Sequence, residues 1–120
     1  MKKLYIAGLL TNGDVEHNID YAIAWGAVYT REGYAVYIPH IQTHEVDKHY
    51  NKDQAISYND WLSKDIAWLE ASDIVVFIPG WEGSKGATIE HTVAQGLDKI
   101  IIYPKGDPYE ILYRQSSESC

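Results

Sequence analysis

The sequence predicts a single α/β domain built on a parallel sheet with helices on both faces. Short, nearly continuous apolar runs such as IVVF at 74–77 are typical of strands that are buried on both sides, as in a parallel sheet. Segments with apolar residues three and four positions apart separate these runs, and this alternation of strand and helix is the pattern of α/β folds. A chain of 120 residues is long enough for one hydrophobic core.

The first two elements have clear boundary signals. KKLYIAG predicts a strand at about residues 3–7, and the loop after it contains the turn signal Asn12-Gly13. A helical pattern then runs over about residues 17–32. Gly33 suits the position just after the last helical residue, where a positive φ is common.

The middle of the chain continues the alternation. YAVYIP at 34–39 predicts the second strand, and we expect the polar segment 39–54 to be irregular. Ser57 and Asp60 have the spacing of a capping box, and the helix that they open extends to about residue 71.

The last third predicts two more strands and a further helix. DIVVFIP at 73–79 is the third strand, a helix follows at about 86–96, and KIIIYP at 99–104 is the fourth strand. We expect one more helical turn in DPYEILYRQ. The domain is expected to span residues 1–113, with a polar, frayed tail at 114–120.

This order of elements predicts a flavodoxin-like (Rossmann-like) three-layer sandwich of about four parallel strands in the order 2-1-3-4. Ligands bind such sheets in the crevice outside the carboxyl ends of strands 1 and 3. The loops GLLTNGD, with Gly8 and Leu10, and PGWEGSKG, with Ser84 and Gly86, lie at that crevice and are polar and rich in glycine. We therefore expect these loops to contact the ligand.

The composition excludes some kinds of partner. A formal net charge of −7 and a pI near 5.0 argue against binding a nucleic-acid polymer, although backbone N–H groups can still bind a mononucleotide. The N-terminal apolar run is short and is interpreted as a strand, so we expect a cytoplasmic protein without a membrane segment. The only cysteine is Cys120, which excludes a disulfide framework and a cysteine metal site. Ten tyrosines and four tryptophans favour a homodimer or higher homo-oligomer.

Two carboxylates are the main candidates for chemistry. Asp65 falls on the apolar stripe of its helix, where it either faces a ligand or is paired, for example with Lys64 or Arg31. Glu90 lies about one turn into the helix after the glycine-rich loop, beside apolar residues. It is either a catalytic group or a carboxylate that stabilises the helix dipole.

Two carboxylates that face one pocket suggest chemistry at a glycosidic bond, in which one acts as nucleophile and the other handles the proton. Exposed N–H groups and the hydroxyl of Ser84 at the start of the same helix are suited to a phosphate. No cofactor is needed for this chemistry, and the spacing of the histidines does not indicate a metal site.

Three further residues have both a functional and a structural interpretation. The hydroxyl of Tyr5, at the end of the first strand, either meets a nucleophile or packs in the core. His40 ends the second strand on the ligand side or is an ordinary exposed loop histidine. Trp81 stacks on a base or covers the core or an interface.

With these residues in place, the chain resembles the nucleoside 2-deoxyribosyltransferase-like proteins, which include 2′-deoxynucleoside 5′-monophosphate N-glycosidases and short phage and bacterial members. The resemblance covers about residues 3–104 and is carried by LYIAG, the histidine of YIPH, and the segment DWLSKDIAWLEASDIVVFIPGWEGSKGATIEHTVAQGLDKIIIYP. The long segment is the specific part.

The resemblance implies roles for these positions. It places the nucleophile at Glu90, a second carboxylate at Asp65 and a tyrosine that contacts the nucleophile at Tyr5. It implies a phosphate-binding serine at Ser84, where the transferases have an aspartate. His40 and Gly86 match a pocket histidine and a loop glycine of the monophosphate hydrolases.

The chain also departs from the hydrolases. They have a phosphate-binding arginine where this chain has Thr11, and Lys85 is the available substitute. We therefore expect hydrolysis of (2′-deoxy)nucleoside 5′-monophosphates by an N-glycosidase. The alternatives are base exchange by a deoxyribosyltransferase and a nucleotide-binding protein without catalysis. The resemblance also implies a homo-oligomer that uses the predicted helices at 57–71 and 86–96.

Overall fold

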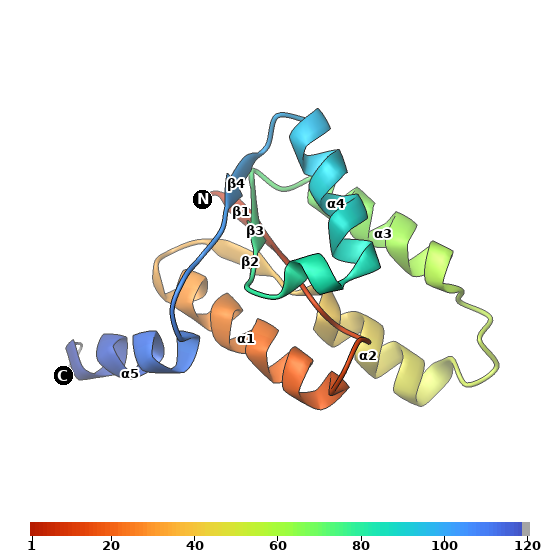
Figure 1. Cartoon of the computed structure of the whole chain (residues 1–120), viewed down its shortest axis with the longest axis horizontal. Helices are drawn as coiled ribbons and strands as arrows, with labels where there is room; N and C mark the ends of the chain where they lie inside the picture. The colour runs from red at the N-terminus through yellow and green to blue at the C-terminus, as the bar shows by residue number, and fades with distance from the viewer. Residues whose placement is uncertain (119–120) are drawn as a thin grey trace.

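Four parallel strands form the sheet in the computed structural model, which describes residues 1–118 (Figure 1). The strands are β1 (Lys3–Ala7), β2 (Ala35–Tyr37), β3 (Ile74–Phe77) and β4 (Ile100–Ile102). Their order is β2-β1-β3-β4, which confirms the predicted α/β fold and strand order. Tyr5 pairs with Tyr37 on one side and with Val75 on the other, so β1 and β3 are the central strands.

Within residues 1–118, five α-helices surround the sheet. They are α1 (Val15–Arg31), α2 (Pro39–Tyr50), α3 (Tyr58–Glu70), α4 (Lys85–Gly96) and α5 (Pro108–Glu118), with a 3₁₀ turn η1 (Trp81–Gly83) before α4. Leu4, Ile6 and Val76 pack with α1 and α5 on one face. Tyr5 and Phe77 pack with α3 and α4 on the other. Strand alternation thus gives the sheet two buried faces, as the apolar runs predict.

The helix boundaries follow from local capping. Ser57 accepts a hydrogen bond from the backbone of Asp60, whose side chain accepts one from the backbone of Ser57, so the predicted capping box is present. Ser84 caps α4 by accepting from the N–H of Ala87 at 3.1 Å. Gly33, with φ of +102°, follows the end of α1 as predicted.

Two sequence expectations were wrong. The segment expected to be irregular at 39–54 contains the helix α2, which begins at Pro39, where a missing N–H costs no helical hydrogen bond. The tail expected from residue 114 continues α5 to Glu118. Arg114 pairs with Glu110 one turn earlier at 2.6 Å, and Arg31 of α1 donates to Ser116 at 2.9 Å. Cys120 lies outside the described residues.

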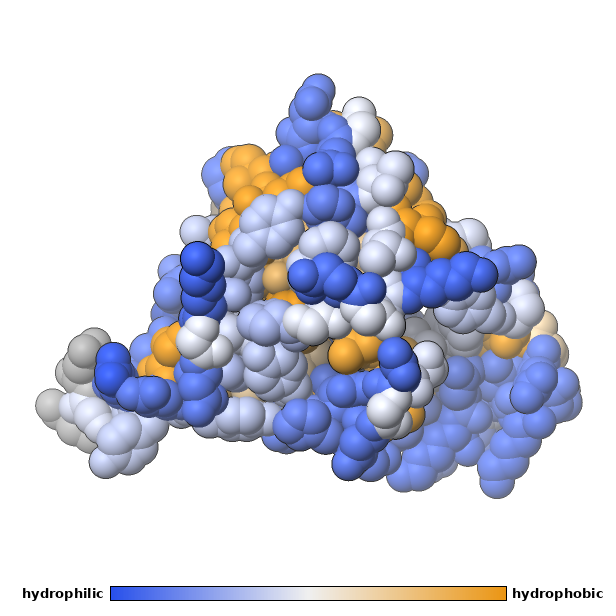
Figure 2. Space-filling model, viewed as in Figure 1, coloured by the Kyte–Doolittle hydropathy of each residue, from blue (hydrophilic) through white to orange (hydrophobic). Residues whose placement is uncertain are grey.

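The molecular surface differs between the two ends of this view. Hydrophilic residues predominate over α2, whereas apolar surface appears beside the edge strand β4, where Ile100 is 54% exposed (Figure 2). An uncovered edge strand of this kind offers unpaired backbone groups and apolar side chains. None of the helices within residues 1–118 is long and apolar enough to cross a membrane.

Candidate active site

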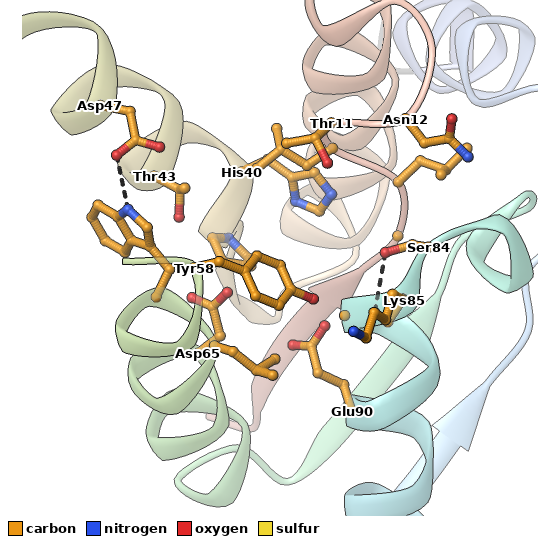
Figure 3. A pocket seen from close by; sticks show the side chains of 18 of the residues that line it. Thr11, Asn12, His40, Thr43, Asp47, Tyr58, Asp65, Ser84, Lys85 and Glu90 are labelled. Atoms are coloured by element: carbon orange, nitrogen blue, oxygen red, sulfur yellow. Dashed lines mark hydrogen bonds between the residues drawn. The ribbon is translucent and has the colours of Figure 1, made fainter. Parts of the chain in front are cut away.

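A cavity of about 920 Å³ opens at the carboxyl ends of β1 and β3, where the topology predicts a ligand (Figure 3). Its walls come from the loop after β1, from α2, from the connection between α2 and α3, from α3, and from the start of α4. Among the predicted ligand-contacting residues, those that line it are Gly8, Leu10, His40, Asp65, Ser84, Gly86 and Glu90.

Glu90 and Asp65 reach this cavity from different helices. Glu90 lies in the second turn of α4 and is 6% exposed, and Asp65 is a partly buried residue of α3. Figure 3 shows both carboxyl groups turned toward the same space. The two groups that are 25 positions apart in sequence therefore form one acidic pair, as the sequence predicts.

Burial raises the pKa of both carboxyl groups. The pKa of Glu90 rises to about 8, mainly through burial and further through the negative charge of Asp65, against a hydrogen bond from Tyr5 that lowers it. Burial raises the pKa of Asp65 to about 7. Near neutral pH the two carboxyl groups therefore hold one proton between them, and a nucleophilic Glu90 requires the form in which that proton lies on Asp65.

Tyr5 supports Glu90 from below the cavity. Tyr5 is completely buried among apolar residues of β3, α3 and α4. Its hydroxyl donates a hydrogen bond to Oε2 of Glu90. Burial and the nearby carboxylates raise the pKa of Tyr5 well above its ordinary value, so the phenol remains a donor. Tyr5 therefore packs in the core and also holds the carboxyl group of Glu90 through its hydroxyl.

The structural alternatives for the carboxylates are not observed. Within residues 1–118, neither Lys64 nor Arg31 forms an ion pair with Asp65, and Arg31 donates instead to Ser116. Glu90 faces a cavity and a tyrosine hydroxyl rather than solvent. An acidic pair that is buried without a cation is costly to stability, which is typical of a functional site.

His40 is buried, at 3% exposed, in the first turn of α2 and is not the exposed loop histidine of the structural alternative. The backbone of Gly8 and Leu9 lies near the ring, but neither ring nitrogen makes a hydrogen bond of good geometry within the described chain. Burial lowers its pKa to about 4. A neutral His40 therefore offers one N–H donor and one acceptor to a ligand.

The loop after β1 is held close to the sheet. A Cβ at Gly8 would lie 2.4 Å from Cγ1 of Ile78, so this close approach requires glycine. The buried Asn18 donates to the carbonyls of Leu10, at 3.0 Å, and of Asn12, at 2.8 Å. Asn18, a polar residue on the buried face of α1, was not among the predicted site residues.

The start of α4 presents hydrogen-bond donors to the cavity. Because Ser84 uses a lone pair to cap Ala87, its O–H remains available to donate. The N–H groups of Lys85 and Gly86 have no helical partner at these positions, and the Lys85 side chain also lines the cavity. Exposed N–H donors of this kind at a helix start are suited to an anion, and this helix start is called the anion seat below. Tyr58 closes it from α3, with its hydroxyl 3.2 Å from where a Cβ of Gly86 would lie.

Trp81 does not line the cavity. Its indole stacks on His91, with ring centroids 4.5 Å apart, and packs against Phe77 at 5.2 Å. The turn η1 directs it to the outer side of β3 and α4, which is the covering role that the sequence analysis gave as its alternative. The expected stacking of Trp81 on a base in this cavity is therefore wrong.

A polar wall on the other side of the cavity was not predicted. Asp47 of α2 accepts hydrogen bonds from Nε1 of Trp61 at 2.8 Å and from Asn51 at 2.6 Å, and Thr43 lies one turn before it. Asn51 also bonds the backbone of Ile56. Thr43 and Asp47 lie on one face only because residues 39–50 form a helix. This wall could not be predicted while the segment 39–54 was expected to be irregular.

Within residues 1–118, no three His, Cys, Asp or Glu side chains come together in a way that could hold a metal ion. Among families, the model described as "Domain of unknown function (DUF4406)" matches residues 2–103, from the first strand to the end of the fourth. No curated protein matches the chain.

Proposed function

The chain belongs to the family described as Domain of unknown function (DUF4406), a description that assigns no activity, and we propose from its site that it hydrolyses the N-glycosidic bond of (2′-deoxy)nucleoside 5′-monophosphates. The observation that carries this proposal is the buried pair of Glu90 and Asp65, which faces one cavity beside an anion seat. The resemblance to nucleoside 2-deoxyribosyltransferase-like proteins points to the same chemistry.

The first half of the reaction uses Glu90 as nucleophile. Its carboxylate attacks C1′ while the bond from C1′ to the base nitrogen breaks, giving a glycosyl ester of Glu90 and a free base. Asp65 delivers its proton to the departing base. Tyr5 orients Glu90 during the attack through its hydrogen bond.

The second half releases the sugar phosphate. Asp65, now ionised, takes a proton from water, and the water oxygen attacks C1′ as the ester bond to Glu90 breaks. The products are the base and the sugar 5-phosphate. Both carboxyl groups return to their starting protonation states.

The preference for a 5′-monophosphate rests on the start of α4. The Ser84 hydroxyl and the first N–H groups of the helix donate to the phosphate, and Lys85 is the only cationic side chain among the cavity-lining residues that the structure describes. An aspartate in place of Ser84 would repel a phosphate. Among the described lining residues no arginine reinforces this seat, because Thr11 occupies the loop position.

A second candidate is a deoxyribosyltransferase, and Thr11 favours it because a free 5′-hydroxyl needs no arginine. The same glycosyl ester would then be resolved by an acceptor base instead of water. A third is a nucleotide-binding protein without catalysis, which has no need of a buried nucleophile.

The test compares Glu90→Ala with Glu82→Ala, which removes an exposed carboxylate outside the cavity. We expect the wild type and Glu82→Ala to release base from deoxynucleoside monophosphates, and Glu90→Ala to lose at least about a thousandfold in kcat. Chromatography measures the free base, and circular dichroism checks the fold. Base release by Glu90→Ala at the wild-type rate would rule out the mechanism.

Adding a free acceptor base to the same assay separates the candidates. Hydrolysis yields sugar phosphate whether or not the acceptor is present, whereas transfer yields a new nucleoside or nucleotide. Tight nucleotide binding with no product in either assay would identify the non-catalytic alternative.

A further inference from the structure

We propose that Asp47 makes the far end of the cavity selective for nucleobases that carry an exocyclic amino group opposite the sugar, as cytosine and adenine do. This inference rests on the proposed function, because it takes a nucleotide to be the ligand. It adds the class of base, which neither the acidic pair nor the anion seat determines.

The order of groups along the cavity directs the base toward Asp47. In Figure 3, Ser84 and Lys85 lie on one side, Asp65 and Glu90 lie in the middle, and Asp47 lies on the other side. A nucleotide with its phosphate on the helix start and its C1′ at the carboxyl pair extends its base away from the phosphate. That direction leads to α2 and the connection between α2 and α3.

The charges of the cavity favour the same orientation. Lys85 and the start of α4 attract the phosphate, whereas Asp47 at the opposite end repels it. The reversed pose would place two negative groups together and leave the helix start without an anion. The nucleotide is therefore oriented by electrostatics before any base-specific contact forms.

Asp47 is held rigidly for such a contact. Both hydrogen bonds that it accepts, from Trp61 at 2.8 Å and from Asn51 at 2.6 Å, end on Oδ1, and Oδ2 accepts neither. Asn51 is 7% exposed and is fixed in turn by two hydrogen bonds to the backbone of Ile56. A carboxylate oxygen in a preorganised network of this kind binds a matching donor with little loss of side-chain freedom.

The selectivity follows from hydrogen-bond chemistry. A carboxylate only accepts, so Oδ2 of Asp47 is matched by an amino group and opposed by a carbonyl oxygen at the same place on the base. Thr43, also at this end, offers both a donor and an acceptor, and it does not discriminate in this way. Among the polar side chains of this end, Asp47 is the one that separates cytosine from uracil.

The test uses dCMP and dUMP, which have the same size and differ in the amino or carbonyl group. We expect the wild type to favour dCMP in kcat/KM by at least about tenfold, as expected for one hydrogen bond to a charged group. Asp47→Asn keeps an oxygen for Trp61 and Asn51 but replaces the other oxygen by an NH₂ donor. This variant should lose or invert the preference.

The control is Asp53→Asn, the same change at an exposed residue of the same segment that does not line the cavity. It should keep the wild-type ratio. Equal kcat/KM for dCMP and dUMP in the wild type, or an unchanged ratio in Asp47→Asn, would overturn the role of Asp47 while leaving the proposed hydrolysis intact.

Calorimetric binding separates this inference from the proposed function. If neither pyrimidine nucleotide is hydrolysed, the affinities of the wild type for dCMP and dUMP decide the inference, and the proposed function is tested separately with a purine deoxynucleoside monophosphate. Tighter binding of dCMP that is lost in Asp47→Asn supports the assignment. Equal binding, or no binding of either nucleotide, overturns it.

Discussion

At the scale of single residues, the sequence predicts best where burial and helical period act together. Glu90 and Asp65 each fall among apolar neighbours on a helix, so their position toward the crevice follows from the period of the helix. The direction of the Trp81 side chain depends on the turn η1. The burial of His40 depends on the helix α2, which the sequence pattern of residues 39–50 does not predict. Those two therefore needed the structure.

The carboxyl pair predicts the pH dependence of the reaction. Below the lower pKa, about 7, both groups are protonated and no nucleophile is available, and above the higher pKa, about 8, no proton remains for the departing base. We expect kcat/KM for base release to be bell-shaped, with its maximum between these values. These are properties of the pair rather than of either residue alone.

Asp65→Asn checks this assignment. The variant should lose the alkaline limb and keep a single acidic limb, which reports the pKa of Glu90, still raised by burial but no longer by the charge of Asp65. The measurement is kcat/KM from pH 5 to 10 for both proteins. An unchanged alkaline limb in the variant would show that Asp65 is not the proton donor.

At the scale of elements, α2 marks the limit of the sequence prediction. The strands and the helices α1, α3 and α4 have strong apolar patterns or caps, whereas α2 has three histidines, few buried residues and no side chain at its N-cap that bonds the first turn. Tertiary contacts with α1 and β1 stabilise it instead. Its proline at the first position was the one available signal.

Asn51 is expected to stabilise the connection between α2 and α3. Asn51→Ala removes hydrogen bonds to the backbone of Ile56 at 2.8 and 2.9 Å and leaves that partly buried N–H without its partner. We expect the free energy of unfolding to fall by about 2 kcal/mol. We also expect KM for the nucleotide to rise, because Asp47 loses a donor.

Urea unfolding and steady-state kinetics measure these two effects. The matched control is Asn59→Ala, at an exposed residue of the first turn of α3, which should change the free energy of unfolding by less than about 0.5 kcal/mol. Equal effects of the two substitutions would mean that Asn51 does not hold this connection.

At the scale of the whole molecule, the site reduces the stability of the fold. The raised pKa of Glu90 means that the folded chain binds a proton more tightly there than the unfolded chain does. Between the ordinary value of 4.5 and the folded value of about 8, the folded state therefore binds more protons, and the free energy of unfolding falls as pH rises. Below pH 4.5, where Glu90 is protonated in both the folded and the unfolded chain, it does not reduce the free energy of unfolding.

Glu90→Gln removes this titration. We expect the variant to be more stable than the wild type at pH 8 by at least about 1 kcal/mol, with the advantage disappearing at pH 4. Urea unfolding at both pH values measures it. Glu82→Gln, at an exposed position, should show no such change with pH. A pH-independent difference for Glu90→Gln would contradict the raised pKa.

The charge that runs along the cavity, from Lys85 at the start of α4 to Asp47 on α2, also sets the order in which the proposed products depart. After the first half-reaction the sugar phosphate is tethered twice, by its ester to Glu90 and by its anion on the helix. The base retains only its weaker contacts at Asp47, so it diffuses out first. In the proposed reaction, the space that it vacates lies beside C1′ and admits the water molecule that completes the turnover.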